Sequence, residues 1–256
     1  MALYVYGLMR AADLAAGAQL QADGTPSVKL VVHEDIAAII GEVADDPVRL
    51  RRELVLAHND VLQGALQRGP VLPLRFGTVV PDEDTLRREL LAPRQAELRA
   101  RLQGLAGKAE FRLKVTYREE VVLREILAAD PKLSRSAARL RGMPAEASHF
   151  QRLDLGEGLS VALEARRESD AQRLLSQLTP LVVAAEVGAL QAPAMVLNAS
   201  FLVADEARAR FDAAVEQLAG EGAQWMEFKL IGPLPAHSFA DGSSGEAAVS
   251  ASGRSA

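Results

Sequence analysis

The sequence predicts an α+β protein that is built from two domains. The chain has 256 residues, which exceeds the usual length of a single domain, about 150 residues. Hydrophobic residues make up 49% and charged residues 25%, a balance typical of folded globular proteins. Short apolar segments with strand-like alternation are separated by segments with helical periodicity, as expected for antiparallel sheets covered by helices.

The first domain is predicted over residues 1–117. Its strands are expected at residues 3–9, 28–32, 36–43, 71–76 and 111–117. A helix should begin at Asp46, which can cap it, and a second should follow Pro81 until Pro93 interrupts it. If residues 11–20 are also helical, the order as far as residue 76 is β-α-β-β-α-β, that of ferredoxin-like folds.

The second domain is predicted over residues 159–240, after a helical connector and linker at residues 118–158. Strands are expected at residues 159–163, 181–190, 195–204 and 225–231, with helices at residues 169–178 and 205–218. This order is again β-α-β-β-α-β and predicts a modified ferredoxin-like domain. Residues 241–256 are small and polar, and we expect them to be a disordered tail.

Charge and composition argue against several classes of protein. The net charge is −5 and basic residues never form a run, so nucleic-acid binding is not expected. The absence of cysteine excludes disulfides, thiolate catalysis and cysteine-based metal sites. The N-terminus has no signal-peptide pattern. The longest uncharged run, residues 187–204, contains Gln191, Pro193 and Asn198, which predicts strands rather than a membrane span.

No local motif indicates catalysis, a cofactor or a metal. His58 is a single histidine on a predicted helix, where a hydrogen-bonding role is more common than ligation. The Gly156-Glu157-Gly158 segment precedes a predicted strand and lacks the third glycine of a dinucleotide loop. We therefore expect no enzyme activity, although an enzyme whose catalytic residues come from distant segments stays open.

Two segments carry unusual residues that are candidates for binding a partner. Residues 71–78 read VLPLRFGT, which places a charge in an apolar strand, and the proline in it is typical of an edge strand. Residues 231–239 read IGPLPAHSF and extend a predicted strand into a proline-containing arm. Simple alternation and a packed arm would also explain these patterns. The candidate partner-binding residues are Leu72, Leu74, Arg75, Phe76, Pro233 and Phe239.

Six short motifs, taken together, resemble the gas vesicle accessory family GvpF/GvpL. They are YVYG at residues 4–7, AHNDVL at 57–62, VLPLRFGT at 71–78, GKAEFRLKV at 107–115, LNASFLV at 197–203 and GPLPAHSF at 232–239. The family usually closes with GPWPPYSF, so Leu234, Ala236 and His237 depart from its pattern. The segment before residue 159, usually similar to GxAYL in the family, differs as well.

The resemblance implies a two-domain protein without enzyme activity or cofactor that helps to build gas vesicles. It implies binding to the small hydrophobic shell subunit GvpA, contact with other accessory proteins, and localisation at the gas vesicle or in the cytoplasm. The segment at residues 71–76 would then form part of the binding surface, with the C-terminal arm controlling access to it. A different class of function also fits the fold: a regulatory module of paired ferredoxin-like domains that senses a small molecule near residues 142–158.

Overall fold

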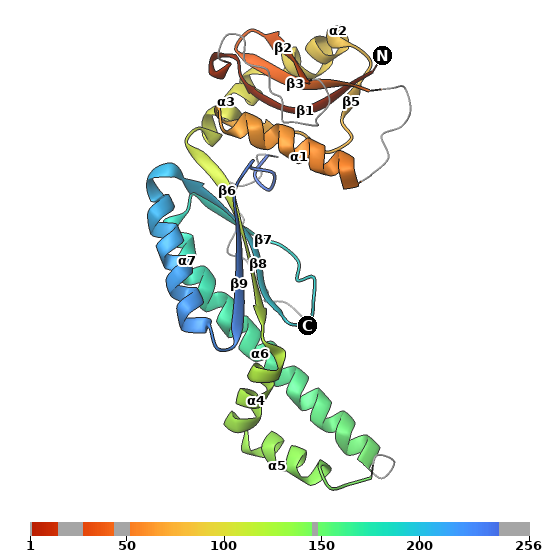
Figure 1. Ribbon diagram of the computed structural model, residues 1–256, viewed down its shortest axis with the longest axis vertical. Helices are drawn as coiled ribbons and strands as arrows, with labels where there is room; N and C mark the ends of the chain where they lie inside the picture. Colours follow the sequence, from red (N-terminus) through yellow and green to blue (C-terminus); the bar gives the residue numbers. More distant parts are fainter. Residues whose placement is uncertain (1, 15–27, 44–51, 145–147, 241–256) are drawn as a thin grey trace, which may run out of the picture. The chain divides into compact units, whose positions relative to one another are not determined.

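The computed structural model describes residues 2–14, 28–43, 52–144 and 148–240, which form two compact units (Figure 1). Unit 1 contains residues 1–111, 202–205 and 231–256, and unit 2 contains residues 112–201 and 206–230. Both units combine helices with a sheet, so the predicted α+β class is confirmed. The predicted disordered tail lies outside the described residues.

The sheet of unit 1 is antiparallel and is built around its first strand. Its strands are β1 (Ala2–Arg10), β2 (Val28–His33), β3 (Ile36–Val43), β4 (Val71–Pro73) and β5 (Val79–Val80). The order is β2-β3-β1-β4, and β5 also pairs with β1. Tyr4 and Tyr6 are buried on one face of β1, while Leu3 and Val5 are buried on the other. Both faces of this central strand are therefore covered.

The helices of unit 1 include one that begins after Pro81, as predicted, and a break where the sequence places a proline. They are α1 (Arg52–Leu66), α2 (Glu83–Thr85) and α3 (Gln95–Leu105). Val61, Leu62 and Ala65 of α1 pack against the β1 face that carries the tyrosines. The stretch between α2 and α3 contains a 3₁₀ turn at Ala92–Arg94, which matches the break expected at Pro93. The expected start of α1 at Asp46 lies outside the described residues.

Two predictions for unit 1 need correction. The strand expected at residues 71–76 ends at Pro73, because residues 74–78 form a turn in which Gly77 has a φ of +87°. β4 does lie at an edge of the sheet, as Pro73 indicated. The helix expected at residues 11–20 begins as a 3₁₀ turn, Ala11–Asp13, and Leu14 is extended. The rest of that segment lies outside the described residues.

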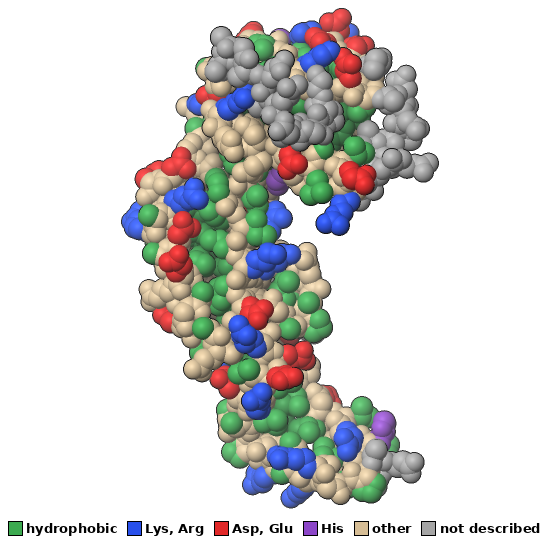
Figure 2. Space-filling model, in the orientation of Figure 1, with side chains coloured by type: hydrophobic (Ala, Val, Ile, Leu, Met, Phe, Trp, Pro, Cys, Tyr) green, Lys and Arg blue, Asp and Glu red, His purple; other side chains and the backbone are tan. Residues whose placement is uncertain are grey.

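The second sheet has the order β7-β8-β6-β9. Its strands are β6 (Lys108–Tyr117), β7 (Ala184–Val187), β8 (Met195–Ala204) and β9 (Met226–Leu234). Its helices are α4 (Glu119–Ala129), α5 (Pro131–Leu140), α6 (His149–Leu178) and α7 (Arg208–Gly222). Phe201 of β8 contacts Phe211 of α7 with ring centroids 5.5 Å apart. Over α7, basic side chains lie near its first turn and acidic ones follow, whereas Lys and Arg side chains gather over α5 (Figure 2).

The strand predicted at residues 159–163 is wrong, because these residues are part of α6. A short apolar run such as LSVAL fits a buried strand and a helix equally well, so its periodicity could not decide between them. In the fold, Gly158 packs against Leu133 of α5, and β6 takes the place of the missing strand. With β6 first, the order of β6, α6, β7, β8, α7 and β9 is again β-α-β-β-α-β.

The ferredoxin-like prediction for the second domain is therefore confirmed with a different first strand. The strand expected at residues 181–190 is also shorter, since β7 covers only Ala184–Val187. The domain boundaries expected at residues 117, 158 and 240 stay a prediction, because the two units are discontinuous in sequence.

Candidate functional site

Four of the six motif segments meet in unit 1 around one group of rings. This ring cluster consists of Tyr4 and Tyr6 of β1, His58 of α1, Phe76 of the turn after β4, and His237 of the segment after β9. The ring centroids of Tyr4 and Tyr6 lie 4.8 Å apart, and those of His58 and Phe76 lie 5.6 Å apart. The centroids of His58 and His237 lie 6.4 Å apart. Segments separated by more than 200 residues thus share one packing site.

Local geometry explains how each ring enters the cluster. Tyr4 and Tyr6 are two residues apart on a strand, so both point to the same face of the sheet. His58 lies one helical turn before Val61 and Leu62, which anchor α1 on that face. The turn after β4 brings Phe76 to Tyr4, with ring centroids 6.0 Å apart.

A chain of hydrogen bonds connects His58 to the turn after β4. The amide of Gly77 donates to the Tyr4 hydroxyl over 3.2 Å, and that hydroxyl lies 2.9 Å from Nδ1 of His58. The Tyr4 hydroxyl can donate its proton to Nδ1 when that nitrogen is unprotonated, and it still accepts from Gly77. Burial lowers the pKa of His58 to about 4, with charge on His237 as a second cause. His58 is therefore neutral at pH 7.

The two phenols of the ring cluster are also uncharged. Burial raises the pKa of Tyr4 and of Tyr6 above the ordinary value, so both phenols keep their protons at pH 7. His58 and the two phenols therefore offer a substrate no charged acid or base. The arrangement is suited to holding segments together and shaping a surface.

The closing segment, residues 233–240, is tied to unit 1 by three sets of hydrogen bonds. The side-chain amide of Gln63 donates to the carbonyl oxygen of Pro233 over 3.0 Å. The amide and hydroxyl of Ser238 donate to the two carboxylate oxygens of Glu110 over 2.8 and 2.9 Å. Arg101 donates to the carbonyl oxygen of Ala240 over 2.9 Å. The predicted packing of a C-terminal arm is thereby confirmed for these residues.

Glu110 is the buried charge on which the closing segment depends. Its side chain is fully buried, although alternation along β6 puts Phe111, Leu113 and Val115 on one face and Glu110 on the other. A buried carboxylate is costly unless hydrogen bonds compensate it, and Ser238 supplies two. Sequence reasoning missed Glu110 because its partner lies 128 residues away. The only available signal was the presence of both residues in motif segments.

The six predicted partner-binding residues all lie in unit 1, but they differ in accessibility. Leu72 and Phe239 are buried, with 2% and 7% of their surface exposed, so they mainly support packing. Leu74, Phe76 and Pro233 are half-buried, and Arg75 is exposed at the tip of the turn. Phe76 packs against His58, and Pro233 is bonded to Gln63, so both contact α1. Their role in binding a partner stays a prediction.

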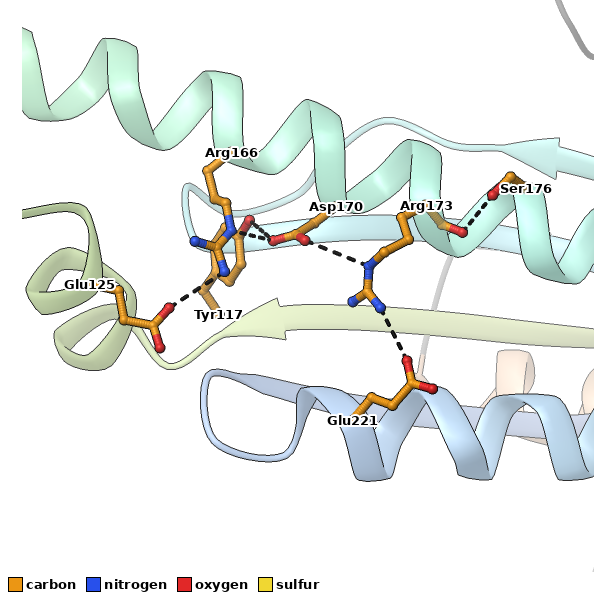
Figure 3. A network of polar contacts seen from close by, with 7 residues as sticks. All are labelled: Tyr117, Glu125, Arg166, Asp170, Arg173, Ser176 and Glu221. Carbon is orange, nitrogen blue, oxygen red and sulfur yellow. Dashed lines mark hydrogen bonds and ion pairs between the residues drawn. The ribbon is translucent and has the colours of Figure 1, made fainter. Parts of the chain in front are cut away.

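A second polar network lies in unit 2 and joins helices to the end of β6 (Figure 3). Asp170 of α6 is at its centre and is almost fully buried. Its Oδ2 accepts from the Tyr117 hydroxyl over 2.8 Å and from Nε of Arg166 over 3.0 Å. Arg173 lies 3.9 Å from Oδ1 and also contacts Glu221 of α7 at 3.2 Å. Burial, followed by the bond to Asp170, raises the pKa of Tyr117.

This network is better suited to structure than to chemistry. Arg166 reaches Glu125 of α4 at 3.4 Å and lies over the ring of Trp225 at 5.9 Å. Each arginine thus connects Asp170 to a different helix, which compensates the buried carboxylate. Among the described residues, no group of three His, Asp or Glu side chains could hold a metal ion. In the same part of the chain, no helix combines the length and apolarity that a membrane span requires.

Comparison with known sequences identifies relatives along almost the whole chain. The family model described as gas vesicle synthesis protein GvpL/GvpF matches residues 2–241. Gas vesicle protein F of Streptomyces sp. (strain CB03234) is 32% identical over 247 residues, covering 94% of this chain and 100% of the relative. Gas vesicle protein F of Dolichospermum flosaquae is 25% identical over 216 residues, covering 84% and 87%.

Comparison with solved structures gives the same fold. The crystal structure of GvpF from Anabaena sp. PCC7120 matches with a TM-score of 0.80 and 24% identity, covering 93% of this chain and 98% of that chain. GvpF from Microcystis aeruginosa matches with a TM-score of 0.74 and 20% identity over the same shares. At these identities, the structures establish the fold alone.

Proposed function

This chain belongs to the gas vesicle synthesis protein GvpL/GvpF family, and on that premise we propose that it binds the hydrophobic shell subunit GvpA. In this proposal it limits aggregation of the subunit, supports vesicle formation and works with other gas vesicle proteins. It acts in the cytoplasm and at the vesicle, where it stays as a minor component. Its role lies with gas vesicles, and no description of the relatives above names a reaction.

The physical case rests on what a hydrophobic subunit needs before assembly. A small protein with large apolar patches or free strand edges aggregates unless another surface covers them. A partner with a net charge of −5 stays dispersed and can shield such a subunit by direct contact. This mode of action requires an exposed surface and no catalytic group.

One observation supports the placement of the binding surface: the motif segments converge on the ring cluster of unit 1. The turn at residues 74–78 leaves Arg75 exposed beside the half-buried Leu74 and Phe76. β4 and β5 form an edge of the sheet, and 41% of the Val79 surface is exposed there. An extended peptide can add to such an edge while its side chains contact the turn. We therefore place the shell subunit against this turn and edge.

The direct test is capture of purified GvpA by variants of the turn. We expect Arg75→Glu to reduce capture by about tenfold, because reversing a charge at the rim of an interface slows association of the two proteins. Arg88→Glu is the matched control, since Arg88 is exposed in the same unit and the charge change is equal. Vesicle yield in a host that lacks the native gene should fall with Arg75→Glu and stay normal with Arg88→Glu.

Truncation after residue 231 tests the closing segment in the same assay. It removes Ser238 and the cover of Glu110, so the thermal midpoint of the truncated chain must be measured alongside capture. Normal capture and normal vesicle yield by a folded Arg75→Glu variant would show that the surface is placed wrongly.

A further inference from the structure

The α5–α6 hairpin has a charge opposite to that of the whole molecule. Lys132, Arg135 and Arg139 are spaced by three and four residues on α5, so they form one row along a helix face. All three are exposed, and none has a carboxylate partner within the described residues. Arg141 follows them at the end of the helix. Figure 2 shows Lys and Arg side chains over the region of α5, in a protein whose net charge is −5.

The neighbouring helix has an exposed row of a complementary kind. Phe150, Leu153 and Val161 of α6 expose 76%, 56% and 66% of their surfaces. Their spacing of three and eight residues places them on one face of the helix. Asp154 and Glu157 lie between them, are exposed, and have no cationic partner in the part of the chain that the structure describes. The row is therefore apolar and acidic.

The two rows lie away from the contact between their own helices. The hairpin is antiparallel, since Gly158 packs on Leu133 and the Ser148 hydroxyl donates to the carbonyl oxygen of Pro144 over 2.8 Å at the turn. At 100° per residue, the basic row is about a third of a turn from Leu133. The row on α6 averages about a quarter of a turn from Gly158, with Asp154 nearest to it at about 40° and Glu157 at about 100°. No ion pair between the rows is found among the described residues. Each row is thus available to another molecule.

We propose that this hairpin face is an interface between two copies of this chain. The basic row of α5 in one copy lies against the apolar and acidic row of α6 in the other, and a two-fold axis repeats the contact. A two-fold interface requires a self-complementary surface, which these rows provide. Residues 132–139 cover about 10 Å of helix, and Asp154 and Glu157 are about 4.5 Å apart along theirs. Two of the three basic side chains can therefore face the two carboxylates when the helices run antiparallel.

The apolar side chains decide whether such an interface is stable. Exposed ion pairs alone contribute little, because water screens them and the long side chains lose freedom. Burial of Phe150, Leu153 and Val161 supplies the apolar contact area, while the charges set the partner and its orientation. This proposal concerns self-association and does not depend on the proposed binding of GvpA.

The test is the mass of the full chain in solution, measured by sedimentation equilibrium and light scattering. At about 50 mM salt we expect a monomer–dimer equilibrium, and at about 500 mM salt a dissociation constant about tenfold higher. Arg135→Glu with Arg139→Glu should weaken the dimer about tenfold, and Asp154→Lys with Glu157→Lys should weaken it similarly. A wild-type chain that stays monomeric at about 200 µM would overturn the proposal.

An equimolar mixture of the two charge-reversed variants is the decisive arm. Each variant alone brings like charges together, whereas the mixture restores opposite charges at both copies of the contact. We expect the mixture to regain about the wild-type dissociation constant. Failure to regain it, with both variants folded, would contradict the interface. If the basic row binds an anionic membrane or a nucleic acid and no second copy, mixing the two variants would restore no dimerisation.

Two further variants separate the interface from net charge and from misfolding. Arg88→Glu with Arg124→Glu lowers the net charge by the same amount as Arg135→Glu with Arg139→Glu, but at exposed positions outside the rows. The dimer should be unaffected by this control. An equal loss in this control would overturn the proposal, because net charge would then explain it. Phe150→Ser alters a highly exposed side chain without adding a charge, so the fold should tolerate it, yet the dimer must weaken. Unchanged dimerisation of this variant would count against the interface.

Discussion

The two sheets of this molecule have the same strand order but very different first connections. Counted from the first strand of each sheet, β2-β3-β1-β4 and β7-β8-β6-β9 are the same arrangement. In the second sheet, α4, α5 and the first half of α6 are added between β6 and β7. Longer connections cost little chain entropy once a sheet is fixed by its own contacts. A long helical insertion can therefore be added to a sheet without altering its topology.

The two units also stabilise their buried polar groups by different means. In unit 1, His58 is kept neutral among rings, and Glu110 accepts hydrogen bonds from the closing segment. In unit 2, Asp170 is compensated by Arg166 and Arg173, which are permanently charged. The stability of unit 1 should thus depend on pH and on the closing segment. The stability of unit 2 should depend on the single carboxylate of Asp170.

The largest effect is expected from Asp170→Ala in unit 2. The change leaves two arginines and the Tyr117 hydroxyl without their shared partner, so unfolding free energy should fall by about 3–4 kcal/mol. Trp225 is the single tryptophan and belongs to unit 2, so its fluorescence reports this transition directly. Glu168→Ala on the exposed side of α6 is the control and should stay within about 0.5 kcal/mol. If both variants lost the same unfolding free energy, Asp170 would contribute no more to stability than an exposed residue.

The next effect should appear in unit 1 as the pH falls. The pKa of His58 is about 4 in the folded state, and its ordinary value is 6.5. Above pH 6.5 the side chain is neutral in both the folded and the unfolded chain, so unit 1 has its full stability there. Stability is lost as the pH falls from 6.5 towards 4, by about 2–3 kcal/mol, because the unfolded chain binds the proton first. Hydrogen exchange of β1 and α1 should accelerate over this range. In His58→Gln, where no proton can bind, that pH response should shrink, and an unchanged response would exclude His58 as its cause.

The smallest effect is expected from Ser238→Ala, which sharpens the role of the closing segment. The variant removes one of the two donors to Glu110 and leaves the backbone donor in place, so the loss should be about 1–2 kcal/mol. Thermal unfolding followed by hydrogen exchange of unit 1 would measure it. Ser134→Ala on an exposed face of α5 is the control, and alanine should be neutral or slightly stabilising there. Equal effects of the two changes would contradict an anchoring role for Ser238.

Much of the fold could be predicted from local pattern, because strand alternation and turn chemistry are encoded by neighbouring residues. The strands β1, β3, β6 and β8 lie close to their expected positions. The error at residues 159–163 arose because helix or strand was decided there by packing on α5, which no local pattern reports. The site was predicted only in part for the same reason. Arg75 and Phe76 stood out in their segment, whereas the pairing of Glu110 with Ser238 depends on a contact across the chain.

The closing segment determines when unit 1 can be completed during synthesis on the ribosome. Unit 1 takes its first part from residues 1–111 and a later part from residues 231–240, so it can be completed only after residues 231–240 have been synthesised. At usual synthesis rates the interval lasts roughly ten seconds. During that time His58 lacks its contact with His237, and Glu110 lacks the two donors of Ser238. A product terminated before residue 231 would keep unit 1 in this incomplete form.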